Sequence, residues 1–170
     1  MFRYWTLHGD EIQEIAAILW AWVGKHMKNY TGMMNFETIG GTIIEAHLRF
    51  ADQWCDLNGK GWIDALVNLY AKGKWRYRDE DRREGYSIPL FARHLNDFLH
   101  PPQDRQSKIR ALPHVSSLQI TFYENKNAAD HPMPPGGFRL GLINCWNLQA
   151  GFDAIDALAK SFAADALFRT

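Results

Sequence analysis

The chain has 170 residues, 46% of them hydrophobic and 22% charged, and its 19 Lys and Arg residues balance its 19 Asp and Glu residues. This length and composition allow a buried core and exclude an intrinsically disordered chain. The zero net charge excludes a strong overall attraction to nucleic acid or to an anionic membrane, so a charged partner would have to meet a local patch.

The two cysteines, Cys55 and Cys145, stand far apart and form no CxxC pair. This usage indicates reduced thiols and gives no sign of a disulfide framework or a zinc site. The N-terminal sequence MFRYWTLHGD lacks the apolar segment of a signal peptide, and the longest apolar run, 15–23, is about half as long as a membrane span. We therefore expect a cytoplasmic protein with no membrane partner, no metal and no cofactor.

Hydrophobic periodicity predicts two well-defined helices in the first half of the chain. The first begins after Asp10, whose side chain is expected to cap it with Gln13 as its capping-box partner, and it continues to about Met27. The other occupies about 63–73, because its apolar residues recur at helical spacing and Gly73 suits the end of a helix.

A further helix is expected between these two. Gly40-Gly41 interrupts the chain, and the following TIIE fits a capping box with Thr42 at the N-cap and Glu45 three residues later. The helix would end at Asn58-Gly59. Its inward face would carry Ile44, Leu48, Ala51 and Cys55.

The pattern changes in the second half of the chain. A fourth helix is expected over 87–100, with Pro89 in its first turn and Pro101-Pro102 ending it. Strands are expected at 118–124, where apolar and polar residues alternate, and at 138–146, which is apolar enough to be buried on both faces. A loop rich in Pro and Gly, 125–137, joins the strands, and a closing helix bears Phe152, Ile155, Leu158 and Phe162.

These elements predict one globular domain over residues 1–170. The predicted fold is mainly α within the α+β class: a compact bundle of about four to five helices with a small two-stranded antiparallel β-element before the C-terminal helix. The helical part would cover about 10–100, and the β-element with its closing helix about 115–170.

Carboxylates on the first two expected helices are similar to those of all-α nucleotide pyrophosphatases, which hold Mg²⁺ through an ExxE and a later ExxD. Glu11 and Glu14 match the first motif, and Glu45 and Asp52 lie where the second is expected. The second motif departs from the pattern because Leu48 follows Glu45 at the third position, so a converging set of four ligands is missing. We therefore predict no metal site here.

The stretch RHLNDFLH at 93–100 places Arg93 and His100 seven positions apart, close to two helical turns. It resembles the R-x(4–6)-H motif of HEPN-type ribonucleases, helical proteins whose active site joins two such motifs across a dimer. The resemblance covers eight residues and implies metal-independent RNA cleavage, in which Arg93 would hold the phosphate and His100 would move the proton of the 2′-hydroxyl. The alternative is two surface residues on a wet helix face, since the helix dipole favours basic residues in a last turn.

Basic and aromatic residues alternate over 72–78, without an acidic residue among them. This pattern suits a strand or extended loop that contacts a protein partner or tracks a phosphate backbone. We call this segment the aromatic-basic strip. Its predicted partner-binding residues are Lys72, Lys74, Trp75, Arg76, Tyr77 and Arg78.

Because no catalytic constellation is complete, the sequence favours a non-enzymatic interaction domain, a small subunit or adaptor of a larger protein or nucleoprotein assembly. It would act through the aromatic-basic strip and the 125–137 loop. We expect a protein partner, with nucleic acid as a second candidate at 72–78. The alternative function is the HEPN-like ribonuclease that uses Arg93 and His100.

Overall fold

The computed structural model describes residues 4–7, 12–50, 58–78, 83–92, 98–127, 130–131 and 138–166. Its contacts divide the chain into two compact units: unit 1 comprises 1–7 and 84–170, and unit 2 comprises 8–83. Each unit has its own antiparallel sheet. Across the described residues, no helix is both long and apolar enough to cross a membrane.

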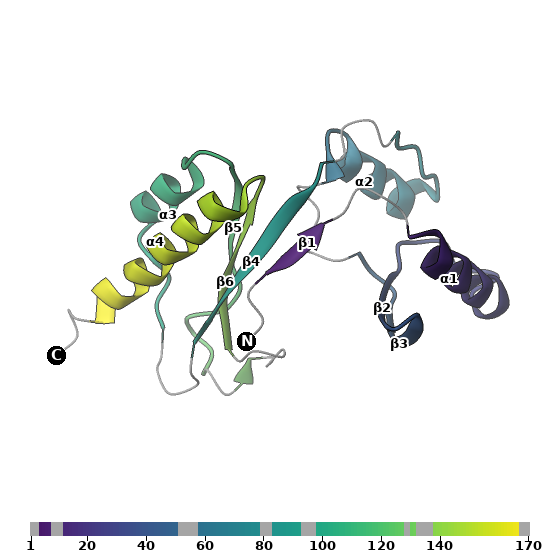
Figure 1. Ribbon diagram of the computed structural model, residues 1–170, viewed down its shortest axis with the longest axis horizontal. Helices are drawn as coiled ribbons and strands as arrows, with labels where there is room; N and C mark the ends of the chain where they lie inside the picture. Colours follow the sequence, from purple (N-terminus) through teal and green to yellow (C-terminus); the bar gives the residue numbers. More distant parts are fainter. Residues whose placement is uncertain are drawn as a thin grey trace. The chain divides into compact units, whose positions relative to one another are not determined.

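Unit 1 is built on a four-stranded antiparallel sheet in the order β1-β4-β6-β5. Helices α3 and α4 lie on one face of this sheet (Figure 1). The elements of unit 1 are β1 Trp5–Leu7, β4 Gly85–Ala92, α3 Gln103–Arg110, β5 Val115–Ile120, β6 Phe138–Cys145 and α4 Leu148–Ala166.

The core of unit 1 lies between the sheet and α4. Ile143 of β6 and Leu158 of α4 are both fully buried there, beside Ile88 of β4. At one end of this core, four phenylalanine rings contact one another with centroids 5.9–6.4 Å apart. These are Phe98, Phe122, Phe138 and Phe162.

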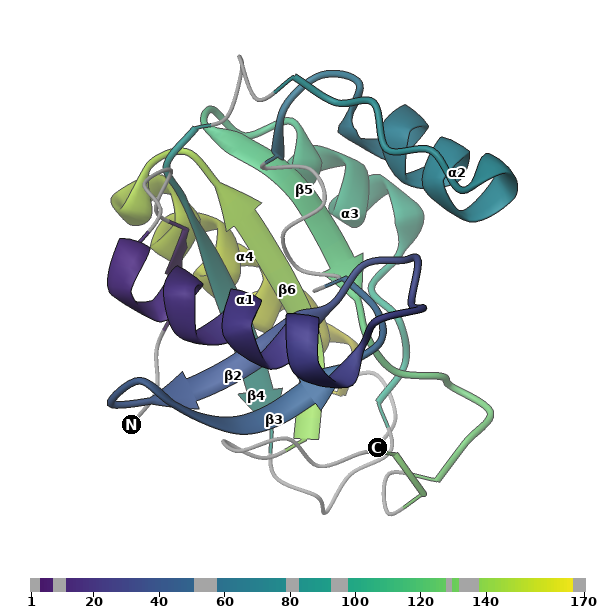
Figure 2. The same cartoon turned by 90° about the vertical axis from the view of Figure 1, so that its right-hand side faces the viewer.

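Unit 2 contains α1 Gln13–His26, the hairpin β2 Asn35–Ile39 with β3 Thr42–His47, and α2 Trp62–Lys72. Gly40 and Gly41 form the hairpin turn with φ of 56° and 80°, the positive values that a two-residue type I′ turn requires. Helix α1 lies beside the hairpin (Figure 2). The Trp22 ring meets the Phe36 ring edge-on there, with centroids 5.5 Å apart.

The predicted helical bundle is wrong. The described residues form four helices and six strands in two antiparallel sheets, an α+β fold in which the strands are not a minor addition. Two strands do pair in this region, but β5 is Val115–Ile120, so only 118–120 of the expected strand 118–124 is a strand, and the β5–β6 pair makes up only half of a four-stranded sheet. That the chain folds as one domain stays a prediction.

The expected second helix is wrong: its first residues form a strand, and 48–50 are irregular. Thr42–His47 forms β3, which pairs with β2 and places Glu37 opposite Glu45. Thr42 and Glu45 fit a capping box, yet both follow a glycine pair that favours a hairpin. The remainder of that predicted helix, 51–57, lies outside the described residues.

The expected fourth helix is wrong as well. Gly85–Ala92 forms β4, which pairs with β1 on one side and β6 on the other. Strand β1 pairs only with 85–87, so Pro89 stands in a part of β4 that has one described neighbour, where its missing N–H is tolerated. Pro101-Pro102 does not end a helix but precedes one, α3.

Other elements are confirmed. Helix α1 forms as expected, although its N-cap residue is Ile12, which makes no side-chain capping bond, and Asp10 lies outside the described residues. Helix α2 ends at Gly73, whose φ of 64° places it in the left-handed region that glycine adopts freely. Strand β6 is buried, and α4 closes the fold.

Candidate functional site

The aromatic-basic strip is on the surface of unit 2. Residues 72–76 and Arg78 are exposed, and Tyr77 is half-buried. The Trp75 ring lies between the rings of Trp62 and Tyr77, with centroids 6.3 Å and 5.7 Å away. The Tyr77 hydroxyl donates a hydrogen bond to the Asn58 carbonyl. The strip therefore presents basic side chains around a tryptophan that α2 holds in place and that is still 41% exposed.

An apolar pocket of about 640 Å³ lies in the same unit, between one face of α1 and the segment 27–36. No residue of α1 is buried, although its apolar stripe faces this pocket. Trp20 at the pocket is 71% exposed. The lining residues are Ile12, Ile15, Ala16, Leu19, Trp20, Val23, Met27, Tyr30, Gly32, Met33, Met34 and Phe36.

Two tyrosines connect the pocket to α2. The Tyr30 hydroxyl donates to the Met33 carbonyl (2.9 Å), and the Met33 N–H donates to the Tyr70 hydroxyl (3.3 Å). Burial and the neighbouring Tyr70 raise the pKa of Tyr30, so its phenol stays neutral and keeps its proton to donate. Tyr70 lies near the end of α2, two residues before the strip begins, whereas Trp75 of the strip packs against Trp62 at the start of α2.

Of the sequence-predicted pair Arg93 and His100, the structure describes only His100. His100 lies in an irregular segment before α3, and Arg93 lies outside the described residues. The His100 Nε2 atom is 2.9 Å from the Phe122 carbonyl oxygen, and its ring meets the Phe122 ring edge-on at 4.8 Å. The His100 N–H donates to the Glu124 carboxylate. These contacts give His100 a structural task, because they tie the chain before α3 to the chain after β5.

The predicted binding loop 125–137 is described only at 125–127 and 130–131. His131 is buried and holds the start of the loop by two contacts. The Tyr123 N–H donates a hydrogen bond to its Nε2, and its Nδ1 lies 2.9 Å from the Asn127 carbonyl oxygen. Its ring also packs against Phe138, with centroids 5.1 Å apart. The described part of the loop is therefore fixed to the core of unit 1, and its role in binding stays a prediction.

Cys145 is fully buried in β6, and burial raises the pKa of its thiol to about 11, an effect that a backbone hydrogen bond from Asn147 partly opposes. A thiol with a raised pKa is a poor nucleophile at neutral pH. Cys55 lies outside the described residues.

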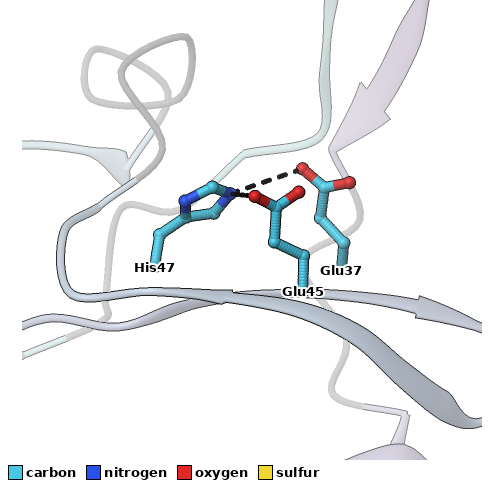
Figure 3. Close-up of side chains that lie close together, drawn as sticks. All are labelled: Glu37, Glu45 and His47. Carbon is cyan, nitrogen blue, oxygen red and sulfur yellow. Dashed lines mark ion pairs between the residues drawn. The ribbon is translucent and has the colours of Figure 1, made fainter.

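One cluster of polar side chains was missed by sequence reasoning. Glu37, Glu45 and His47 point to the same side of the β2–β3 hairpin (Figure 3). The His47 Nε2 atom lies 3.3 Å from a Glu45 carboxylate oxygen and 3.8 Å from one of Glu37. The signal was the Glu-x-His spacing after a Gly-Gly turn, which places both side chains on one face if the segment is a strand.

The chain matches no family model and no curated protein.

Proposed function

We propose that the chain is a non-enzymatic interaction domain whose unit 2 binds a partner protein. The observation that carries this proposal is α1, an apolar helix with no buried residue, beside a large apolar pocket. Contiguous apolar surface of this kind is typical of a site that another molecule covers. Exposed Trp20 and Trp75 are of the residue type most enriched among energetically dominant interface residues.

The partner that fits this surface is a protein segment with apolar side chains for the pocket and acidic side chains for the strip. The pocket lining is mostly apolar, and the three methionines at 27, 33 and 34 offer flexible side chains that adapt to an inserted group. The strip, in the same unit, carries four basic side chains and no acidic one. Charge complementarity therefore favours a partner segment with both properties.

Nucleic acid is the weaker candidate for the same strip. A phosphate backbone would meet Lys72, Lys74, Arg76 and Arg78, but bases would need free aromatic faces to stack on. The rings of Trp75 and Tyr77 already contact each other, and Tyr77 is half-buried. The apolar pocket has no role in binding a polyanion.

We also propose that the protein acts in the cytoplasm, as part of a larger assembly. The free thiol of Cys145 supports a reducing compartment. The HEPN-like alternative has less support, because His100 does not lie in a helix, and Arg93 lies outside the described residues. We therefore do not propose it.

Site-specific photo-cross-linking in the native host tests the proposal. A photoreactive amino acid replaces Trp20 at the pocket, Trp75 in the strip or, as a control, Tyr123, an exposed aromatic of unit 1. The same protein should cross-link at 20 and 75 and not at 123. RNA or DNA cross-linked at position 75 would instead favour nucleic acid as the partner of the strip.

The captured protein is then purified and titrated with variants. Trp20→Glu should weaken its affinity by about thirtyfold, the loss typical of a dominant interface residue. The charge reversal Lys74→Glu should weaken it less and mainly slow association. Unchanged affinity in Trp20→Glu, or equal cross-linking at 123, would contradict the proposal.

A further inference from the structure

A side-chain cluster outside the proposed binding surface has the composition of a metal centre. Glu45 and His47 are two residues apart on β3, and Glu37 lies opposite Glu45 on β2. The nearest ligand atoms of these three residues all lie within 4.8 Å of one another. Because Glu37 follows Phe36, whose ring contacts α1, the cluster points to the other face of the hairpin.

The geometry points to a transition-metal site: we propose that Glu37, Glu45 and His47 bind one divalent ion of the zinc class, with solvent completing its coordination. Imidazole with carboxylates suits Zn²⁺, Mn²⁺ or Fe²⁺, whereas Mg²⁺ and Ca²⁺ prefer oxygen donors alone. Zinc sites with three protein ligands and an open position are well known. The exposure of both carboxylates, 53% and 55%, leaves room for a water ligand.

The distances between the three side chains are compatible with a bound metal. A charge-assisted hydrogen bond between imidazole and carboxylate is about 2.7–2.9 Å long. The two distances from His47 Nε2 are longer, 3.3 Å and 3.8 Å. Zinc holds its ligands at about 2.0–2.2 Å, so that donor atoms of a tetrahedral site lie about 3.3–3.6 Å apart. The His47–Glu45 distance already matches, and the Glu37 oxygen, 3.8 Å from His47 Nε2, lies slightly beyond this range.

The electrostatics of the hairpin point the same way. Glu37 and Glu45 are directly opposed in the register, an arrangement in which like charges repel. A cation bound between the two carboxylates removes this repulsion. The hairpin also fixes the three backbone positions in advance, because its Gly40-Gly41 turn and the register shift between Glu37 and Thr38 together place Glu37 opposite Glu45.

Zinc titration of the untagged full chain, followed by calorimetry and by thermal unfolding, tests the site. Wild type should bind one Zn²⁺ equivalent at the hairpin, and its melting temperature should rise with zinc concentration. His47→Ala and Glu37→Gln should each weaken binding by about tenfold or more. The matched controls, His26→Ala and Glu14→Gln on α1, should bind as wild type does.

Cobalt adds a readout that does not depend on affinity. Co²⁺ bound at this site should give a visible absorption band that disappears in Glu45→Gln, a variant whose circular dichroism without metal should equal that of wild type. Three outcomes would overturn the proposal: no zinc bound by wild type, equal zinc binding in His47→Ala, or displacement of zinc by equimolar Mg²⁺. Any of these would leave the cluster as an ion pair only.

Discussion

Gly151 in α4 lies so close to Cys145 in β6 that a Cβ atom at position 151 would stand 2.3 Å from the Cys145 Sγ and 2.5 Å from the Ile88 Cδ1. Glycine at this position is what lets α4 approach the sheet. The contact joins the last helix to the two central strands of unit 1, β4 and β6. Unit 1 thus depends on a residue that helix propensity alone would disfavour.

We therefore predict that Gly151→Ala lowers the free energy of unfolding by about 1–3 kcal/mol, because an added methyl group overpacks the core. Urea denaturation followed by circular dichroism measures the effect. Gly24→Ala in α1 is the control: nothing lies within 4 Å of its added Cβ, so helix propensity should raise stability by up to about 1 kcal/mol. In a Cys145→Ala background the cost of Gly151→Ala should shrink. An unchanged cost would mean that the close approach to Cys145 is not its cause.

His100 is predicted to stabilise the fold and to have no catalytic role. His100→Ala should lower the free energy of unfolding by about 1–2 kcal/mol, because the hydrogen bond to the Phe122 carbonyl is lost. Lys108→Ala, which breaks an exposed ion pair with Asp104, should change stability by less than about 0.5 kcal/mol. RNA incubated with wild type, Arg93→Ala or His100→Ala should stay equally intact. Cleavage by wild type that both variants abolish would restore the HEPN-like reading.

Stability should fall at alkaline pH because of Cys145. Burial raises the pKa of this thiol from 9.0 to about 11, so the folded protein keeps a proton that the unfolded chain loses between these values. The stabilising effect is complete below pH 9 and is lost as the pH rises to 11, a change of about 2 kcal/mol. In Cys145→Ser, whose hydroxyl does not ionise, this part of the pH dependence should be absent. Parallel stability curves for both proteins over pH 8–11 would contradict the prediction.

The elements that could be predicted from the sequence are those whose signals are local. Helix α2 has a regular apolar period and ends at Gly73, and α4 has the same period over a longer stretch. Strand β6 is an apolar run that is too short for a buried helix. In these segments propensity, pattern and end signals agree, so the tertiary structure had nothing to override.

The misread elements are two strands, β3 and β4, whose sequences also fit a helix. The bulge between Leu90 and Phe91 interrupts the alternation of inward and outward side chains along β4. The apolar residues of β4 therefore match a helical period. At 38–45, the sequence TIGGTIIE fits both a helix cap and a hairpin. Gly40 and Gly41 both adopt the positive φ that a two-residue hairpin turn requires, and this decides for the hairpin.

The candidate sites also differ in whether they are formed by one continuous segment or by residues that the fold brings together. The aromatic-basic strip is a continuous segment, so its composition could be read directly, and its exposure agrees with a binding role that stays a prediction. The pocket needs α1 to face residues 33–36, and the metal cluster needs the register that sets Glu37 opposite Glu45. Neither arrangement follows from the sequence without the hairpin.

We expect a partner protein to cover the apolar face of α1. The most direct measurement is the native mass of the protein purified gently from its own host, with absorbance at 260 and 280 nm recorded together. Wild type should exceed the 19.6 kDa of the chain and carry another protein without nucleic acid, whereas Trp20→Glu should run at the mass of the chain alone. A wild type that is a bare monomer or a homodimer, or a complex that Trp20→Glu leaves intact, would contradict the account.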